Sequence, residues 1–212
     1  LMEKFIIQGG RPLRGEVSPS GNKNAALPLL AACLLTDQPV ILHNLPEIND
    51  VKTMRGLLAS LGVDITHLEG HSWKIHAKEV HAQSLDRTLC NQIRASVLLA
   101  GPMSARVGQL TLPPPGGDVI GRRRIDTHIL ALSSLGIEAQ YIPDRKVFSF
   151  HTQELTGKEI LLDEASVTAT ENAVMAASLA SGKTILRNAA SEPHVQELCH
   201  FLNALGANIK HI

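Results

Sequence analysis

The sequence predicts an α/β protein built from three related units of about 70 residues with pseudo-threefold symmetry. One observation is a recurring helix end, a leucine-glycine stop followed by the start of a strand, in LLASLGVDI (57–65), ALSSLGIEA (131–139) and FLNALGANI (201–209). The second is an apolar helix, a polar turn and a strand that begin at Asn24, Arg94 and Glu171. Two features in register favour a true repeat over the alternative, unrelated amphipathic helices that happen to end in Leu-Gly. We expect the more apolar helices inside and the strands outside.

Each unit is expected to contain two helices and several short strands. The first unit, about 21–90, is predicted to form helix 22–35, strand 39–43, helix 50–61 and strands near 63–67 and 72–76. The second, about 91–158, is predicted to form helix 91–104, strand 107–112, helix 124–135 and strands near 137–142 and 146–150. The third, about 159–212, is predicted to form strand 159–162, helix 169–180, strand 183–187, helix 192–205 and a final strand. Gly62, Gly136 and Gly206 stand at the helix stops, where glycine suits a left-handed backbone.

Composition excludes several classes of function. Lys+Arg and Asp+Glu balance at 20 each, which argues against binding nucleic acid through a basic face. The sequence has no apolar span of the length a membrane helix needs and no signal-peptide core near its start, so we expect a cytoplasmic protein without membrane contact. Cys33, Cys90 and Cys199 are expected to be free, buried thiols. The histidines and cysteines lack metal-ligand spacing, and no phosphate-loop or dinucleotide motif occurs, so neither a metal nor a cofactor is expected.

The helix openings predict anion binding. A helix start presents unpaired N–H groups and partial positive charge, and here Lys23, Asn24 and Arg94 add donors at two of the three equivalent starts. Pro28 is expected in the first turn or so, where its missing N–H costs little. In the third opening, SVTATEN, Thr168 and Glu171 fit a capping box and leave the Ser166 hydroxyl free. The alternative is that these are solvated side chains at ordinary helix starts.

A loop between a predicted strand and a predicted helix is especially rich in reactive polar side chains. It reads LPPPGGDVIGRRRIDTH (112–128), and its prolines and glycines exclude regular structure. Asp118 follows two glycines, and three arginines, 122–124, stand close to it. These arginines favour the ionised carboxylate, whereas burial under a closed loop favours the acid form, which can donate a proton. The alternative is a solvated loop with a local ion pair.

Five motifs together resemble the UDP-N-acetylglucosamine enolpyruvyl transferases. They are GEVSPSGNKNAALPLLAACLL, IRASVLLAGPMSARVG, LPPPGGDVIGRRRIDTHI, SVTATENAVMAA and NAASEPHV, in this order, and the resemblance runs from Met2 to about Ile212. The sister enzymes of the shikimate pathway have a different opening sequence motif and lack the Pro-Gly-Gly loop. The resemblance implies an inside-out α/β barrel of the enolpyruvyl transferase type, in two lobes of three repeats each. It also implies transfer of the enolpyruvyl group of phosphoenolpyruvate to the sugar 3′-hydroxyl with release of phosphate, the first committed step of peptidoglycan synthesis.

The resemblance also implies roles for individual residues. Lys23 and Asn24 would contact phosphoenolpyruvate, Arg94 would serve the substrate anions, and Asp118 would occupy the proton-donor position. The segments implied to line the UDP-sugar site are Arg123, Arg124, Ile125, Asp126 and Thr127, and Glu164, Ala165, Ser166 and Val167.

Two departures from the family's pattern matter. Most members carry cysteine where this chain has Asp118, so we expect resistance to fosfomycin, an epoxide that alkylates the thiol. The three repeats account for one lobe of two, so we interpret 21–212 as the N-terminal lobe of a longer enzyme, poorly active alone. Residues 1–20 are expected to form an opening strand that belongs with the C-terminal lobe, which also carries the family's general-base aspartate. The alternative from a different class is a non-catalytic paralogue that binds anions or nucleotide sugars; a transport or scaffold role is a more distant one.

Overall fold

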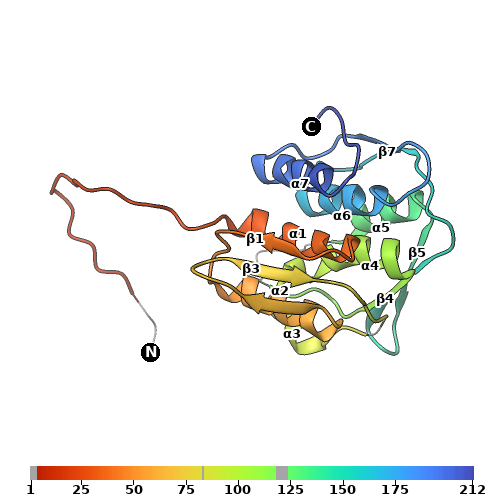
Figure 1. Ribbon diagram of the computed structural model, residues 1–212, viewed down its shortest axis with the longest axis horizontal. Coiled ribbons are helices and arrows are strands. Elements are labelled where there is room, and N and C mark those ends of the chain that lie inside the picture. The colour runs from red at the N-terminus through yellow and green to blue at the C-terminus, as the bar shows by residue number, and fades with distance from the viewer. Residues whose placement is uncertain (1–3, 83, 118–123) are drawn as a thin grey trace.

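The computed structural model describes residues 4–82, 84–117 and 124–212, and it shows helices at the centre with small sheets around them (Figure 1). The first unit comprises α1 (Lys23–Ala32), η1 (Cys33–Leu35), β1 (Val40–Leu42), α2 (Asn49–Ser60), β2 (Asp64–His67) and β3 (Trp73–His76). The second comprises α3 (Arg87–Gln92), η2 (Arg94–Leu99), α4 (Ala100–Val107), β4 (Gln109–Leu112), α5 (Asp126–Ser134), β5 (Ile137–Ile142) and β6 (Val147–Thr152). The third comprises β7 (Glu159–Leu161), α6 (Val167–Ala177), β8 (Ile185–Arg187) and α7 (Pro193–Ala204). Here η denotes a 3-10 helix.

The sheets repeat from unit to unit. The first two units form antiparallel sheets with equivalent strand orders, β1-β3-β2 and β4-β6-β5. In the third unit β7 pairs in parallel with β8. The second unit has the counterpart of that parallel pairing, a bridge between Ser84 and Thr111 of β4. In both cases a segment that precedes the central helices runs parallel to the strand that follows them, as a true repeat requires, and the predicted architecture is confirmed.

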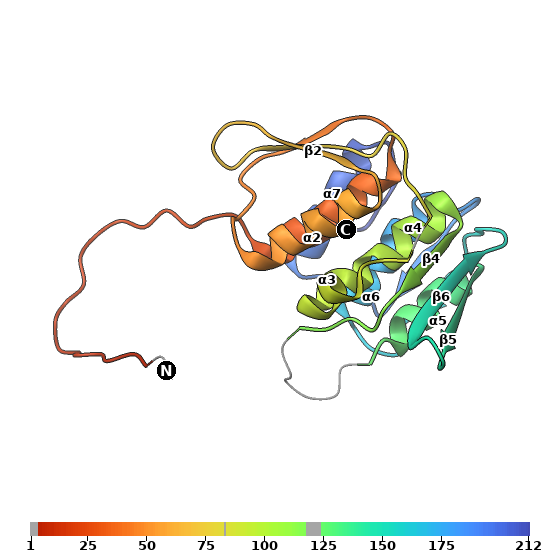
Figure 2. The same cartoon turned by 90° about the horizontal axis from the view of Figure 1, so that it is seen from below.

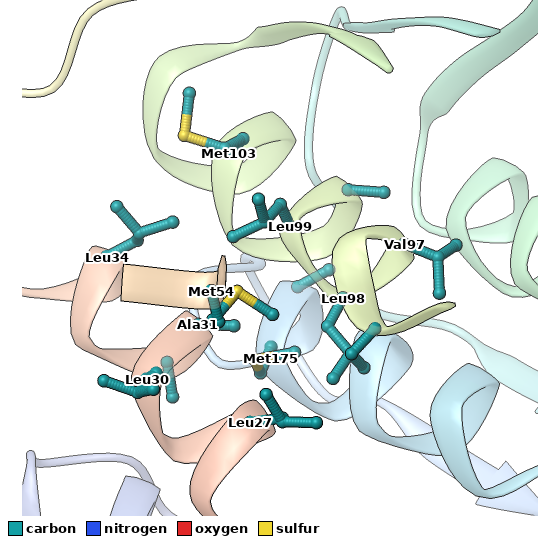
Figure 3. Packing of buried hydrophobic residues seen from close by; sticks show 14 of the residues in the cluster. Leu27, Leu30, Ala31, Leu34, Met54, Val97, Leu98, Leu99, Met103 and Met175 are labelled. Atoms are coloured by element: carbon teal, nitrogen blue, oxygen red, sulfur yellow. The ribbon is translucent and has the colours of Figure 1, made fainter. Parts of the chain in front are cut away.

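The core lies where the central helices of the three units meet. Figure 3 shows side chains of α1, of η2 with α4, and of α6 packed together, including Leu27, Leu98 and Met175. Residues such as Leu30 and Leu99 have no exposed surface, and full burial of a leucine side chain stabilises the fold by roughly 1.5–3 kcal/mol. Figure 2 shows the β4-β6-β5 sheet packed beside α4 and α5, on the outside of this helical centre.

The helix stops behave as predicted. Gly62, Gly136 and Gly206 follow α2, α5 and α7 with φ of 92°, 97° and 108°, the left-handed region that a glycine adopts at little cost. A further pair shares this backbone conformation. Asn44 follows β1 and Asn188 follows β8, and both have φ of 56°.

Several sequence-based predictions of helices and strands differ from the structure. The predicted helix 91–104 is broken at Ile93, whose φ of −133° and ψ of 137° are extended; a short helix, α3, precedes the break, and η2 and α4 follow it. The predicted third-unit helix 169–180 is shifted, because α6 runs from Val167 to Ala177. Pro28 is the sixth residue of α1, inside the helix, where its ring cannot donate to the Asn24 carbonyl.

The predicted final strand is also absent, since residues 207–212 form neither helix nor strand. The cause lies in the side-chain amide of Asn203 on α7. Asn203 accepts a hydrogen bond from the backbone N–H of Ile209 at 2.7 Å and donates one to its carbonyl at 2.9 Å. Both backbone groups of Ile209 are thereby held by the preceding helix rather than by a neighbouring strand.

The opening segment, in its described residues 4–22, forms no helix or strand and extends away from the body of the domain (Figures 1 and 2). Its large apolar side chains are nearly fully exposed: Phe5, Ile6, Ile7, Leu13 and Val17. That 1–20 forms a strand with a second lobe stays a prediction. Within the described ranges, no helix has the length and apolar character needed to cross a membrane.

Candidate functional site

A cavity of about 380 Å³ opens where the start of η2, the segment after β4 and the start of α5 meet. Its lining residues are Arg94, Pro114, Pro115, Arg124, Ile125, Asp126 and Phe148. Four of these, Arg94, Arg124, Ile125 and Asp126, are site residues expected from the sequence. The structure thus brings together two segments that are 30 residues apart in the chain.

Among the described residues that line this cavity, the charged ones are two arginines, Arg94 and Arg124, and one carboxylate, Asp126. The guanidinium Nη2 of Arg94 donates a hydrogen bond of 2.8 Å to the backbone carbonyl of Arg124. The Arg124 side chain in turn pairs with the carboxylate of Asp126. That pair is exposed and contributes little stability, so it can open when an anionic ligand competes for the guanidinium. Two guanidinium groups beside one carboxylate leave the cavity with an excess of positive charge, which suits phosphate or carboxylate groups.

Gly116 and Gly117, in the proline- and glycine-rich loop that follows β4, are held beside Arg94 by backbone hydrogen bonds. The backbone N–H groups of Gly116 and Gly117 donate to the carbonyls of Cys90 at 2.9 Å and Asn91 at 3.3 Å. A Cβ on Gly116 would lie 1.8 Å from the Asn91 carbonyl oxygen, and one on Gly117 would lie 3.0 Å from the Arg94 nitrogen. Only glycine allows so close an approach. Asp118 and Arg123, two predicted site residues, lie outside the described residues, as does Arg122.

The two segments expected at the UDP-sugar site are joined by a hydrogen bond. Thr127 Oγ1 donates to the Asp163 carboxylate at 2.7 Å, which fixes 124–127 beside 164–167. Glu164 and Ala165 are exposed just before α6, and the Ser166 N–H bonds to the Glu164 carbonyl at 2.8 Å.

The predicted capping box is wrong, because α6 begins two residues earlier than that motif requires. Ser166 is the N-cap, and its hydroxyl accepts a hydrogen bond from the Ala169 N–H at 3.4 Å, so it is not free as predicted. Glu171 is the fifth residue of the helix and lies 2% exposed in the interior, where its Oε1 has no hydrogen-bond partner among the described residues. Burial raises the pKa of Glu171 to about 8, and the charge of Glu192 adds to the rise.

Lys23 and Asn24 occupy the start of α1, outside the lining of this cavity. The side chain of Asn22 caps the helix by accepting a hydrogen bond from the Asn24 N–H at 2.8 Å, and Lys23 Nζ pairs with Asp50 of α2 at 3.1 Å. Figure 3 shows α1 and the η2–α4 run lying side by side and pointing the same way, from Leu27 to Leu34 and from Val97 to Met103. Their openings are therefore turned toward the same end of the domain. Whether all three helix openings share one ligand stays a prediction.

The motifs did not reveal a buried polar network behind the cavity. His128 of α5 is 2% exposed, and its ring nitrogens contact Thr168 at 3.1 Å and Asn172 at 2.9 Å on α6. Burial, with the nearby positive charge of Arg94, lowers the pKa of His128 to about 3. The signal in the sequence is the placement of His128 and Asn172 within apolar helical turns, DTHILAL and TENAVMAA, where a polar side chain needs a partner.

Comparison with known proteins places these features in a family. The profile of EPSP synthase (3-phosphoshikimate 1-carboxyvinyltransferase) matches residues 7–212, almost the whole sequence. The chain therefore belongs to the EPSP synthase family, the class of enolpyruvyl transferases.

Within that class, the chain is similar to proteins named UDP-N-acetylglucosamine 1-carboxyvinyltransferase. It is 54% identical to the protein of Treponema denticola over 208 residues, which are 98% of this chain and 48% of that relative. It is also 54% identical to the Bradyrhizobium diazoefficiens protein, over 99% of this chain and 48% of that one. The chain spans about half the length of the curated relatives it matches.

Solved structures agree on the fold. The enolpyruvyl transferase NikO from Streptomyces tendae superimposes with a TM-score of 0.81 at 21% identity, over 95% of this chain and 47% of that one. An EPSP synthase from Acinetobacter baumannii gives a TM-score of 0.72 at 19% identity, over 93% of this chain and 45% of that one. The expected inside-out α/β fold of one enolpyruvyl transferase lobe is thereby confirmed.

Proposed function

We propose that this chain is the N-terminal lobe of an enzyme that transfers the enolpyruvyl group of phosphoenolpyruvate to the 3′-hydroxyl of UDP-N-acetylglucosamine. The observation that carries the proposal is the cavity lined by Arg94, Arg124, Ile125 and Asp126, four residues expected at this site from family motifs. Relatives that share 54% of the sequence carry the name of that activity. Both substrates are anions, and the excess of guanidinium groups at the cavity matches them.

The reaction proceeds by addition and elimination. The sugar 3′-oxygen forms a bond to C2 of phosphoenolpyruvate as C3 takes up a proton, and the hydroxyl proton passes to a base. The C2–O bond to phosphate then breaks, a proton leaves C3, and the double bond is restored. Asp118, in its acid form, is the proposed donor to C3, while Arg94 and Arg124 hold phosphate and diphosphate oxygens. Lys23 and Asn24 are the proposed contacts of phosphoenolpyruvate, and the base belongs to a second lobe.

The proposed partner of this chain is that second lobe. The apolar side chains of the opening segment support it, because a row of exposed residues such as Phe5, Ile6 and Ile7 normally packs against something. A cytoplasmic location is part of the same proposal, since phosphoenolpyruvate is made in the cytoplasm.

A phosphate-release assay tests the function. The protein that joins this chain to its second lobe is mixed with phosphoenolpyruvate, with and without UDP-N-acetylglucosamine, and free phosphate is measured. We expect release that depends on the sugar and is lost in Asp118→Asn, which keeps the shape of the side chain but cannot donate a carboxylic proton. Release near zero from the unsubstituted protein would instead favour a non-catalytic paralogue that binds anions.

A further inference from the structure

The buried amide of Asn172 joins four neighbouring helical segments. Its Oδ1 accepts a hydrogen bond from the Gly101 N–H at 2.7 Å, and its Nδ2 donates to the Val97 carbonyl and to His128 Nδ1, each at 2.9 Å. Exchanging the amide oxygen and nitrogen would set a donor against the Gly101 N–H and an acceptor against the Val97 carbonyl. The orientation of this side chain is therefore fixed by its backbone partners.

That orientation decides the state of the His128 ring. Because Asn172 Nδ2 donates to Nδ1, that ring nitrogen carries no proton, and the neutral ring holds its proton on Nε2. Protonation of Nδ1 would place two donors face to face beside the charge of Arg94. The lowered pKa of His128 agrees with a ring that stays neutral.

The chain of donors continues from His128 to Thr168 at the start of α6. His128 Nε2–H donates to Thr168 Oγ1 at 3.1 Å, so the Thr168 hydroxyl is an acceptor on its buried side. A hydroxyl that accepts from the interior keeps its own proton for another oxygen. Thr168 is half-buried and directly follows Ser166 and Val167, two residues proposed at the UDP-sugar site.

We propose that His128 is a positioning residue that aims the hydroxyl proton of Thr168 at an oxygen of the bound nucleotide sugar. This inference rests on the proposed function and adds a ligand-binding residue, Thr168, and the relay Asn172–His128 that orients it. The relay is neutral throughout, so it supplies direction without adding charge to the cavity that Arg94 and Arg124 already make positive.

Two measurements test this inference. The first is the ¹⁵N spectrum of the histidine-labelled chain, in which long-range couplings distinguish the two neutral tautomers. We expect the His128 signals of the Nε2–H form near neutral pH, unchanged down to pH 5. The Nδ1–H tautomer or a protonated ring would overturn the inference, and no variant is needed for this test.

The second measurement is the affinity of the chain for UDP-N-acetylglucosamine by calorimetry. Thr168→Val, which removes the hydroxyl but keeps the shape, should bind on the order of ten-fold more weakly, whereas Thr168→Ser should stay within about two-fold. His128→Leu should weaken binding in the unsubstituted chain. It should cause no further loss in the Thr168→Val background, because the hydroxyl that His128 orients is already absent there. A purely structural role of His128 predicts the same loss in both backgrounds.

The outcomes separate the two proposals. If the unsubstituted chain binds the nucleotide sugar and Thr168→Val binds it equally well, the positioning role fails while the proposed function stands. If the unsubstituted chain shows no affinity for the nucleotide sugar, the proposed substrate and the ligand-binding role of Thr168 fail together.

Discussion

Gly101 and Asn172 stand 71 residues apart in the sequence and are in contact at the centre of the domain, where the Gly101 N–H donates to Asn172 Oδ1 at 2.7 Å. A Cβ on Gly101 would lie 2.6 Å from the Asn172 carbonyl oxygen. The second and third units can approach this closely only because one of them presents bare backbone at the contact.

Replacement of Gly101 by alanine should therefore destabilise the fold. The added methyl group meets backbone rather than a flexible side chain, so helices have to move apart, at a cost of about 2–4 kcal/mol. Urea denaturation measures this free energy. The matched control is Gly56→Ala in α2, where the new Cβ meets Leu89 Cδ1 at an ordinary 3.5 Å; this change should be neutral or stabilising. Equal stability of the two variants would contradict the close contact.

Glu171→Gln should stabilise the chain at alkaline pH. The pKa of Glu171 is raised from 4.5 to about 8 in the folded chain, so the unfolded chain loses this proton first. The contribution of this group to the free energy of unfolding is therefore largest below about pH 4.5, and it decreases as the pH rises to about 8. At pH 9 the glutamine variant should be more stable by roughly 1–3 kcal/mol, and the advantage should disappear at pH 4. The control is Glu197→Gln, the same chemical change at an exposed position of α7. The same pH-dependent gain in both variants would contradict a role for the burial of Glu171.

Fosfomycin should not inactivate the two-lobe protein, because position 118 offers a carboxyl group and no thiol. Phosphate release in the presence of saturating fosfomycin should stay near its uninhibited rate. Asp118→Cys supplies the matched control and should become sensitive to the epoxide. Irreversible loss of activity in the unsubstituted protein would contradict this expectation.

Arg94→Lys should weaken binding of UDP-N-acetylglucosamine by on the order of ten-fold. Lysine keeps the charge but not the fork that can hold a ligand oxygen while bonded to the Arg124 carbonyl. Calorimetry on the chain measures the affinity. Arg187→Lys, on β8 and paired with Glu159, makes the same chemical change away from the cavity and should leave affinity unaltered.

The cysteines should be unreactive in the folded chain. Cys33, Cys90 and Cys199 are free and buried, as the sequence predicts. Burial raises the pKa of Cys33 to about 12 and that of Cys90 to about 11, so almost no thiolate is present near neutral pH. A colorimetric thiol reagent should therefore label the folded chain slowly and label all three cysteines after urea is added. Rapid labelling without denaturant would argue against the packing around α1 and α3.

The parts of the fold that local patterns specify could be predicted. Gly62, Gly136 and Gly206 indicate the repeat, because a helix end in the left-handed conformation favours glycine whatever the tertiary surroundings of the helix. The break at Ile93 could not be predicted, since an extended residue between two helical turns depends on the loop that packs against it. Of the cavity residues, Arg94 could be predicted because it stands at a repeated helix start, where a charged side chain favours anion binding. The positions Arg124, Ile125 and Asp126 came from the resemblance to the family. His128 and Asn172 were missed because their function is expressed only through contacts between distant helices.

The opening segment has a consequence for the chain in solution. Phe5, Ile6 and Ile7 are consecutive, uncovered and carried on a backbone without strand partners. Such a stretch promotes intermolecular β pairing, so concentrated samples should precipitate or form oligomers whose size grows with concentration. Limited proteolysis that trims the chain ahead of Asn22 should restore a monodisperse sample and leave the packed helices intact.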